Sequence, residues 1–263
     1  MKKLAGEKAL EHVKDGMILG LGTGSTVKYT LEKLGEMVKE GLEIEGIPTS
    51  MHTRKLAKEY SIPLTTLNEN PEIDITIDGA DEVDSKLNLI KGGGGALTRE
   101  KIIAYYSKKE IIVIDDSKIV KMLGIDFPLP VEVLKYGWTS TKKTLEKFGC
   151  NVELRKIVDE PYITDNSNYI LDCEFERITE PEQLEIDINN IPGVVENGLF
   201  IGLADEIIVG SKQGIITLEK EVLSWLFFKI YYDISPDFSD ELILGIVTLF
   251  ANILFDIIVY WIL

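Results

Sequence analysis

The sequence predicts an α/β fold with a largely parallel sheet and helices on both faces. Between residues 17 and 114, short apolar runs of strand character alternate with helical patterns, in which apolar residues recur every three or four positions. A polar or glycine-rich cluster follows four of the apolar runs, and the clusters read GLGTGST, DGADEVD, KGGGGALTRE and DDSK. Ligands of open α/β proteins bind at the carboxyl ends of the strands, so the four clusters are expected to converge on one cleft.

The first half of the chain supplies most of the predicted sheet. Strands are expected at residues 17–21, 43–48, 64–67, 73–77, 87–90 and 111–114. Helices are expected at residues 4–14, 27–40, 51–60 and 98–108, where the apolar positions fall on one side of a helix. A turn at Asp15 and Gly16 separates the first helix from the first strand.

A smaller unit is predicted to interrupt this domain. The segment FPLP at residues 127–130 has two prolines in four residues and is interpreted as a linker. Residues 128–199 then form a small α+β domain, with strands expected at 131–133, 151–155 and 169–175 and helices at 139–148 and 181–189. Residues 200–220 are expected to rejoin the first sheet, so residues 1–127 and 200–220 together form the larger domain.

Composition limits the classes of partner. The 263 residues carry a formal net charge of −16, which leaves no overall basic surface and excludes nucleic acid as the expected partner. A phosphorylated small molecule stays compatible with this charge, because a few lysines and backbone amides bind one phosphate. Cys150 and Cys173 show neither disulfide nor metal-ligand spacing, and the amino-terminal segment does not have the pattern of a signal peptide. These features predict a cytoplasmic protein with reduced thiols.

The carboxyl-terminal segment, residues 221–263, has an unusual composition. Residues 242–255 carry no charge, Asp256 interrupts the run, and seven apolar residues complete it. A membrane-spanning helix needs about 20 apolar residues, and the acidic residues that precede this borderline run disfavour a membrane partner. Three interpretations remain: a membrane-anchoring tail, a packed or oligomer-forming hydrophobic helix, and a tail unrelated to the function of the main body.

The glycine-rich turn after the first strand is typical of an anion site. Thr23, Gly24, Ser25 and Thr26 lie between a predicted strand and a predicted helix, so backbone N–H groups and the helix dipole point at a ligand. Neither a Walker A loop nor the dinucleotide-binding fingerprint fits, because the required lysine and third glycine are missing. Taken alone, the turn is either a phosphate loop or a tight connection without a ligand.

If the ligand is a sugar phosphate, residues 78–101 contain the groups that an enzyme would need to move the sugar carbonyl from C1 to C2. Such a reaction requires a base that carries a proton between two carbons and a cation or donor that stabilises the oxyanion. Glu100 is the candidate base, and its place near a helix start predicts an ionised carboxylate at neutral pH. Lys91 and the glycine amides after it would face the oxyanion. Asp78 and Asp81 would hold hydroxyls or assist ring opening, and Lys118 would join residues 23–26 at the phosphate.

Most of these candidates also have a plain structural interpretation. In isolation, Glu100 is more often a solvated helix residue, Lys118 a surface side chain, and Asp84 a turn or cap residue. His12 and His52 lie far from the acidic cluster in the sequence and have no ligand spacing, so no metal site is predicted. The acidic run also does not fit an EF-hand calcium loop.

The clusters GLGTGST, DGADEVD and KGGGGALTREK, in this order and spacing, resemble the type A ribose-5-phosphate isomerases. PTSMHTRKLAKEYSIPL, DDSK, PYITDNSNYILDC and IPGVVENGLF extend the resemblance over about residues 1–218. It implies a Rossmann-like domain with a smaller inserted α/β domain, assembled as a homodimer or homotetramer. It also implies an isomerase of the pentose phosphate pathway that interconverts ribose 5-phosphate and ribulose 5-phosphate without a metal or other cofactor. Ser167 stands where the family usually has glycine, and the tail has no counterpart in the family.

The resemblance also assigns roles to residues of this chain. Glu100 is similar to the proton-transferring base of the family, and Lys91, Asp78 and Asp81 to its sugar-binding and polarising groups. The substrate-binding positions that it implies are Thr23, Gly24, Ser25, Thr26, Asp78, Gly79, Ala80, Asp81, Lys91, Gly92, Gly93, Gly94 and Lys118. Two alternatives remain: a sensor domain that binds a sugar phosphate without converting it, and a deaminase or transferase of the same wider fold group.

Overall fold

The computed structural model describes residues 1–219 of the chain, and the predicted tail at 221–263 lies outside the described residues. The larger sheet has six strands: β1 (Ile18–Leu21), β2 (Glu45–Pro48), β3 (Ile75–Asp78), β6 (Glu110–Asp115), β14 (Glu206–Ser211) and β15 (Gly214–Glu219). Their order is β15-β14-β6-β3-β1-β2, and every neighbouring pair is parallel except β14 with β15. The predicted α/β fold with a largely parallel sheet is confirmed.

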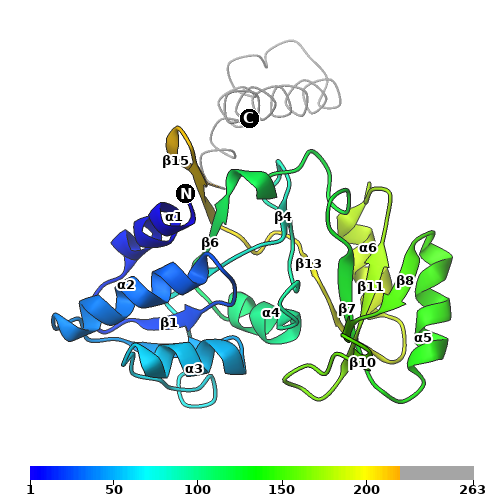
Figure 1. The fold of residues 1–263 in the computed structure, drawn as a ribbon, viewed down its shortest axis with the longest axis horizontal. Helices are drawn as coiled ribbons and strands as arrows, with labels where there is room; N and C mark the ends of the chain where they lie inside the picture. The colour runs from blue at the N-terminus through cyan, green and yellow to red at the C-terminus, as the bar shows by residue number, and fades with distance from the viewer. Residues whose placement is uncertain (220–263) are drawn as a thin grey trace, which may run out of the picture.

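Helices cover both faces of this sheet (Figure 1). Helices α1 (Lys2–Ala9) and α2 (Val27–Lys39) pack on one face, and α4 (Leu97–Tyr105) packs on the other. The strands direct alternate side chains to the two faces. In β6, for example, Ile111 belongs to the core under α1 and α2, whereas Ile112 belongs to the core under α4. Helix α3 (Met51–Glu59) contacts α2 and β2 at the sheet edge.

A second, antiparallel sheet lies beside α4, which contacts two of its strands (Figure 1). Its strands, in the order β12-β7-β11-β8, are β12 (Val194–Asn197), β7 (Leu129–Val133), β11 (Tyr169–Glu174) and β8 (Asn151–Leu154). Helices α5 (Trp138–Leu145) and α6 (Pro181–Asn189) belong to the same part of the chain. The predicted linker at 127–130 is wrong in its second half. Leu129 and Pro130 are the first residues of β7, where they pair with β11, and Leu129 is completely buried in the core of this sheet.

Short elements connect the two sheets. A small antiparallel sheet has the order β13-β5-β4, from β4 (Glu82–Val83), β5 (Leu89–Ile90) and β13 (Leu199–Phe200). A ribbon of β9 (Lys156–Ile157) and β10 (Glu160–Pro161) and the 3-10 helices Leu10–His12, Asp116–Lys118 and Glu146–Phe148 complete the described part. Within residues 1–219, no helix is both long and apolar enough to cross a bilayer.

Two sequence-based expectations about strands are wrong. No strand forms at residues 64–67, where Leu64 makes only an isolated bridge with Gly46 and the chain then turns through hydrogen bonds back to Thr66. The cluster KGGGGALTRE does not follow a strand of the parallel sheet. It follows β5, which belongs to the small antiparallel sheet. Only three of the four clusters therefore lie at the carboxyl ends of parallel strands, after β1, β3 and β6.

Candidate active site

The three clusters on the parallel sheet meet because β6, β3 and β1 are neighbours. Strand β1 pairs with β2 on one side and with β3 on the other, so the chain changes its direction of winding across the sheet at β1. Open α/β sheets bind ligands at such a switch point, beyond the carboxyl ends of the strands. The fourth cluster reaches the same place from the β4–β5 hairpin, since the N–H of Asp81 donates to the carbonyl of Ile90 (2.8 Å). The convergence of all four clusters holds, although one arrives by a different route.

A cavity of about 170 Å³ lies at this junction. Its lining consists of Lys2, Thr23, Gly24, Ser25, Thr26, Gly79, Ala80, Asp81, Lys91, Gly92, Gly93, Gly94, Glu100, Val113, Ile114, Asp115 and Lys118. All predicted site residues except Asp78 are in this set. Lys2 is a residue that sequence reasoning missed, because it belongs to α1 and no motif surrounds it.

Lys91 is the centre of a buried charge cluster beside the cavity. Its side chain is 2% exposed, and its Nζ lies 3.1 Å from Oδ2 of Asp78 and 3.6 Å from Oε2 of Glu100. The ammonium also donates a hydrogen bond to the carbonyl of Gly79. Burial lowers the pKa of Lys91, but the charges of Asp78 and Glu100 outweigh this effect and raise the pKa above its usual value. Lys91 therefore stays a cation.

Glu100 lies in the first turn of α4 and is 3% exposed. Burial raises its pKa to about 8; the charge of Lys91 opposes this rise, and Asp78 and Asp81 add to it. The sequence-based expectation of a carboxylate ionised at neutral pH is therefore wrong. It assumed that the helix dipole lowers the pKa of Glu100, whereas burial raises this pKa and outweighs the dipole. A carboxyl group with a pKa near the working pH is suited to take up a proton and return it.

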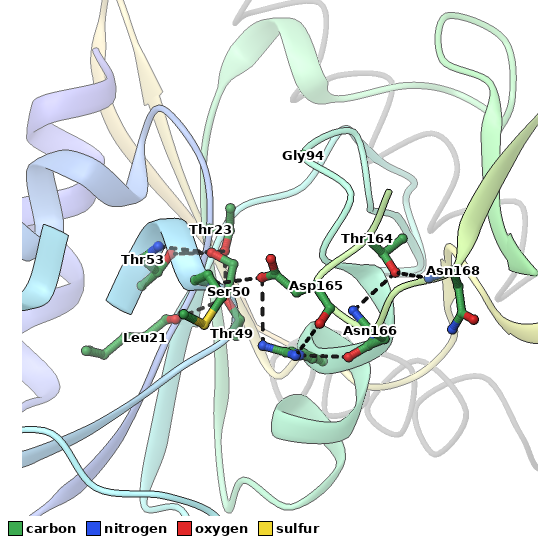
Figure 2. A network of polar contacts seen from close by, with 12 residues as sticks. Leu21, Thr23, Thr49, Ser50, Thr53, Gly94, Thr164, Asp165, Asn166 and Asn168 are labelled. Atoms are coloured by element: carbon green, nitrogen blue, oxygen red, sulfur yellow. Dashed lines mark hydrogen bonds and ion pairs between the residues drawn. The ribbon is translucent and has the colours of Figure 1, made fainter. Parts of the chain in front are cut away.

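Asp78, at the end of β3, lies behind the cavity wall and is completely buried. Its Oδ1 accepts hydrogen bonds from the N–H groups of Thr23 (2.9 Å) and Gly79 (2.7 Å), while its Oδ2 faces Lys91. Asp78 thus fixes Lys91 and the Thr23 turn together. The Thr23 hydroxyl is held in addition by the hydroxyls of Thr49 (2.8 Å), Ser50 (2.8 Å) and Thr53 (3.0 Å), as Figure 2 shows.

The glycine loop needs glycine for two different reasons. Gly92 has a φ of 105°, in the region that side chains rarely adopt. At Gly93, a Cβ atom would lie 2.6 Å from Oδ1 of Asp81, whose Oδ2 accepts the N–H of Gly93 at 2.7 Å. Arg155, which sequence reasoning missed, directly follows β8 of the second sheet and donates to the carbonyls of Gly92 (2.8 Å) and Gly93 (3.1 Å). The loop is therefore held from both sides.

The end of the cavity near α2 is positively polarised. Thr26 precedes α2 and provides no side-chain cap, although the main-chain carbonyls of Gly24 and Thr26 accept the N–H groups of Lys28 and Tyr29 (both 3.1 Å). The positive end of the helix dipole faces this turn. Nζ of Lys2 donates to Oγ of Ser25 (2.9 Å) and lies 3.6 Å from Oδ2 of Asp115. Nζ of Lys118 lies 6.0 Å from the centre of the Phe127 ring. Such an arrangement suits a phosphate group.

The residues set aside in the sequence have ordinary partners. Asp84 is a turn residue, as its sequence context suggests, because its Oδ1 accepts the N–H groups of Lys86 (2.8 Å) and Asn88 (2.9 Å). Nε2 of His12 lies 3.2 Å from Oε2 of Glu206. Among the described residues, no three His, Cys, Asp or Glu side chains form a group that could hold a metal ion.

Comparison with known proteins identifies a family whose members are similar to this chain in sequence and in fold. The sequence model of the family described as ribose 5-phosphate isomerase A (phosphoriboisomerase A) matches residues 45–214. Ribose-5-phosphate isomerase A of Bacillus mycoides is 52% identical over 216 residues, which cover 82% of this chain and 97% of that protein. The same-named protein of Thermococcus kodakarensis is 48% identical over 224 residues, covering 84% and 98%.

Solved structures agree with the sequence relatives. A D-ribose-5-phosphate isomerase in complex with phospho-erythronic acid has a TM-score of 0.81 and 46% identity, and the match covers 83% of this chain and 97% of that one. Ribose 5-phosphate isomerase A of Methanocaldococcus jannaschii has a TM-score of 0.80 and 44% identity, with coverage of 83% and 98%.

Proposed function

This chain belongs to the ribose 5-phosphate isomerase A family, and we propose that it interconverts ribose 5-phosphate and ribulose 5-phosphate with Glu100 as the base. The observation that carries the proposal is the buried Lys91 ammonium between Asp78 and Glu100, beside a cavity with a positively polarised end. A base, a permanent cation and a phosphate site are the three parts that this reaction requires.

The proton transfer uses Glu100 twice. Its carboxylate removes the proton from C2 of open-chain ribose 5-phosphate, the electrons of the C2–H bond form a C1=C2 double bond, and the carbonyl electrons move to O1. Lys91 and the amides of Gly92, Gly93 and Gly94 stabilise the resulting enediolate without a metal ion. Glu100 then returns the proton to C1 while the proton on O2 passes to O1, which gives the ketose.

The other site residues bind and orient the substrate. The N–H groups of Gly24, Ser25 and Thr26, together with Lys118 and Lys2, bind the phosphate. Asp81 accepts hydrogen bonds from sugar hydroxyls and assists ring opening, since one of its carboxylate oxygens is free of the Gly93 amide. Asp78 acts from behind the cavity wall, where it fixes Lys91 and the Thr23 turn.

Conversion of ribose 5-phosphate in the presence of EDTA tests this function. We expect the wild type to be active and Glu100→Gln to be about 100- to 10,000-fold slower, which is the usual range for loss of a general base. Glu59→Gln, an exposed glutamate of α3, serves as the matched control and should keep full activity. A wild type that binds the sugar phosphate without converting it would instead identify a sensor.

The organisation of the chain is part of the proposal. We expect residues 1–127 and 200–220 to form the catalytic domain, residues 128–199 the smaller one, and the protein to act in the cytoplasm as a homodimer or homotetramer. Exposed apolar side chains support self-association: Met51 is 51% and Ile102 44% exposed, and both line the same surface depression. Light scattering of the full chain determines the oligomeric state, and a monomeric mass would rule out the assembly.

A further inference from the structure

The turn at residues 164–168, which precedes β11 of the second sheet, lies next to elements that carry both ends of the candidate site (Figure 2). The turn is fixed internally, because Oγ1 of Thr164 accepts the N–H groups of Asn166 (3.2 Å) and Asn168 (3.1 Å). Ser167 has a φ of 66°, the left-handed region in which glycine is the usual residue. The turn is therefore a defined structural unit.

The first turn of α4, which carries Glu100, depends on outside contacts for its orientation. Its preceding residue, Ala96, provides no side-chain cap. Instead, Oγ1 of Thr98 donates a 2.6 Å hydrogen bond to Oε2 of Glu132, a fully buried carboxylate of β7. The same carboxylate accepts hydrogen bonds from the hydroxyl of Thr164 (2.9 Å) and the side chain of Asn168 (2.9 Å). The turn and the catalytic helix thus share one anchor.

Arg99, the residue before Glu100, forms the second link. Its Nε donates to Oδ1 of Asn166 (2.9 Å), and its Nη2 donates to the main-chain carbonyl of Asp165 (2.8 Å). Its Nη1 also lies 3.7 Å from Oδ2 of Asp165. Arg99 therefore binds the turn directly, whereas Thr98 is linked to it through Glu132, and the two contacts together fix how the first turn of the helix is rotated.

The side chain of Asp165 extends in the other direction, to α3. Its Oδ2 accepts the N–H of Met51, the first residue of α3, at 2.7 Å. Ser50, which caps this helix, accepts hydrogen bonds from the N–H of Thr53 (3.0 Å) and from the hydroxyl of Thr23 (2.8 Å). A continuous set of hydrogen bonds therefore runs from the Thr23 turn through the start of α3 to Asp165.

We propose that Asp165 is a positioning residue that fixes the distance between the base Glu100 and the phosphate-binding turn at Thr23. The inference rests on the proposed function, because it assigns Asp165 the task of holding a bound sugar phosphate with C1 and C2 at the base. An error of about 1 Å in such an alignment costs on the order of 100-fold in rate. Asp165 and Arg99 are both about one-third exposed, so their contacts add little to folding stability.

The test compares Asp165→Ala, Arg99→Met and the double variant in ribose 5-phosphate turnover, with Arg54→Met and Asp187→Ala as matched controls. Arg54 is an exposed arginine of α3, and Asp187 is an exposed aspartate whose side chain meets Gln183 of its own helix. We expect each test variant to lower kcat/KM about 10-fold and the double variant to be no worse than the poorer single one. Asp165→Asn keeps an oxygen for the Met51 N–H and should restore KM to within about 3-fold of the wild type.

Each outcome bears on the proposal. Melting temperatures within about 2 °C of the controls, together with the non-additive loss, support a positioning role. Additive losses in the double variant would mean that the two contacts act independently, and unchanged kcat and KM in Asp165→Ala would overturn the role of Asp165. A wild type without isomerase activity would instead refute the proposed function, so the two failures are distinguishable.

Discussion

The Nζ atom of Lys91 lies 3.1 Å from Oδ2 of Asp78, and both side chains are almost completely buried. Removing either charge from water is costly, and their mutual attraction offsets that cost only while both are present. Asp78 also binds the N–H of Thr23, so one carboxylate controls both the cation of the site and the turn at the phosphate end.

Replacing Asp78 by asparagine should distinguish the effect of its charge on Lys91 from the effect of the hydrogen bonds that it accepts. In Asp78→Asn, an oxygen remains for the N–H groups of Thr23 and Gly79, but the partner charge of Lys91 is lost and the pKa of Lys91 falls. We expect kcat to fall about 100-fold in steady-state kinetics, with KM changed less. Asp84→Asn, in a buried turn outside the cavity, is the control. Equal effects of the two variants would count against this role of Asp78.

Removing Lys91 should weaken the fold as well as the activity. Lys91→Met leaves the buried carboxyl groups of Asp78 and Glu100 without their cation, and breaking a buried pair costs about 3–5 kcal/mol. Burial raises the pKa of Glu100 and Lys91 opposes this rise, so in the variant the pKa of Glu100 lies further above its unfolded value. The lost stability should therefore be largest near neutral pH and smaller near pH ~4, where protonation relieves the charges. Urea unfolding at the two pH values measures this difference.

The activity should rise with pH through the pKa of Glu100. The base works only when deprotonated, and burial raises its pKa to about 8. Below this pKa, kcat/KM is expected to increase about tenfold per pH unit, and then to level off above it. A profile in buffers of constant ionic strength checks the slope. A flat profile between pH ~5 and ~8 would contradict the assignment of Glu100.

The loop glycines should differ sharply in their tolerance of a methyl group. At Gly93, a Cβ atom would lie 2.6 Å from Oδ1 of Asp81 and 2.9 Å from the Phe127 ring, whereas at Gly94 the nearest atom, on Thr23, lies 3.5 Å away. Gly93→Ala should therefore destabilise the protein by about 1–3 kcal/mol, the usual cost of overpacking. Gly94→Ala should leave the melting temperature unchanged. Thermal unfolding of both variants measures this difference. Equal melting temperatures would contradict the prediction and show that the loop moves to make room for the methyl group at residue 93.

The sequence predicted the parts of this site that consist of local motifs. Short strands that end in polar clusters were sufficient to place residues 23–26 and 79–81 at one cavity, because strand ends of a parallel sheet lie at the same edge. Residues 91–94 were also placed at this cavity correctly, although they reach it from the antiparallel β4–β5 hairpin. Asp84 was assigned to a turn correctly for the same reason, since its partners Lys86 and Asn88 are its neighbours in the chain.

Features that depend on distant packing escaped prediction. Lys2 and Arg155 reach the site from other elements, and nothing in their local sequence indicates this contact. The direction of the Glu100 pKa shift depends on the burial of its side chain, which an argument from its position near a helix start does not include. The strand expected at residues 64–67 was lost for a similar reason, because pairing partners rather than local apolarity decide whether a short run becomes a strand.

The central claim is that Glu100 carries the proton between C1 and C2. The most direct test incubates ribose 5-phosphate with the protein in deuterated water and follows deuterium at C1 of ribulose 5-phosphate by NMR, for the wild type and Glu100→Gln. We predict that the wild type forms the ketose, with deuterium entering at C1 in the fraction of turnovers in which the proton on Glu100 exchanges with solvent before it is returned. The variant should show neither product nor exchange over the same time. Exchange in Glu100→Gln at the rate of the wild type would contradict the claim and assign the base to another residue.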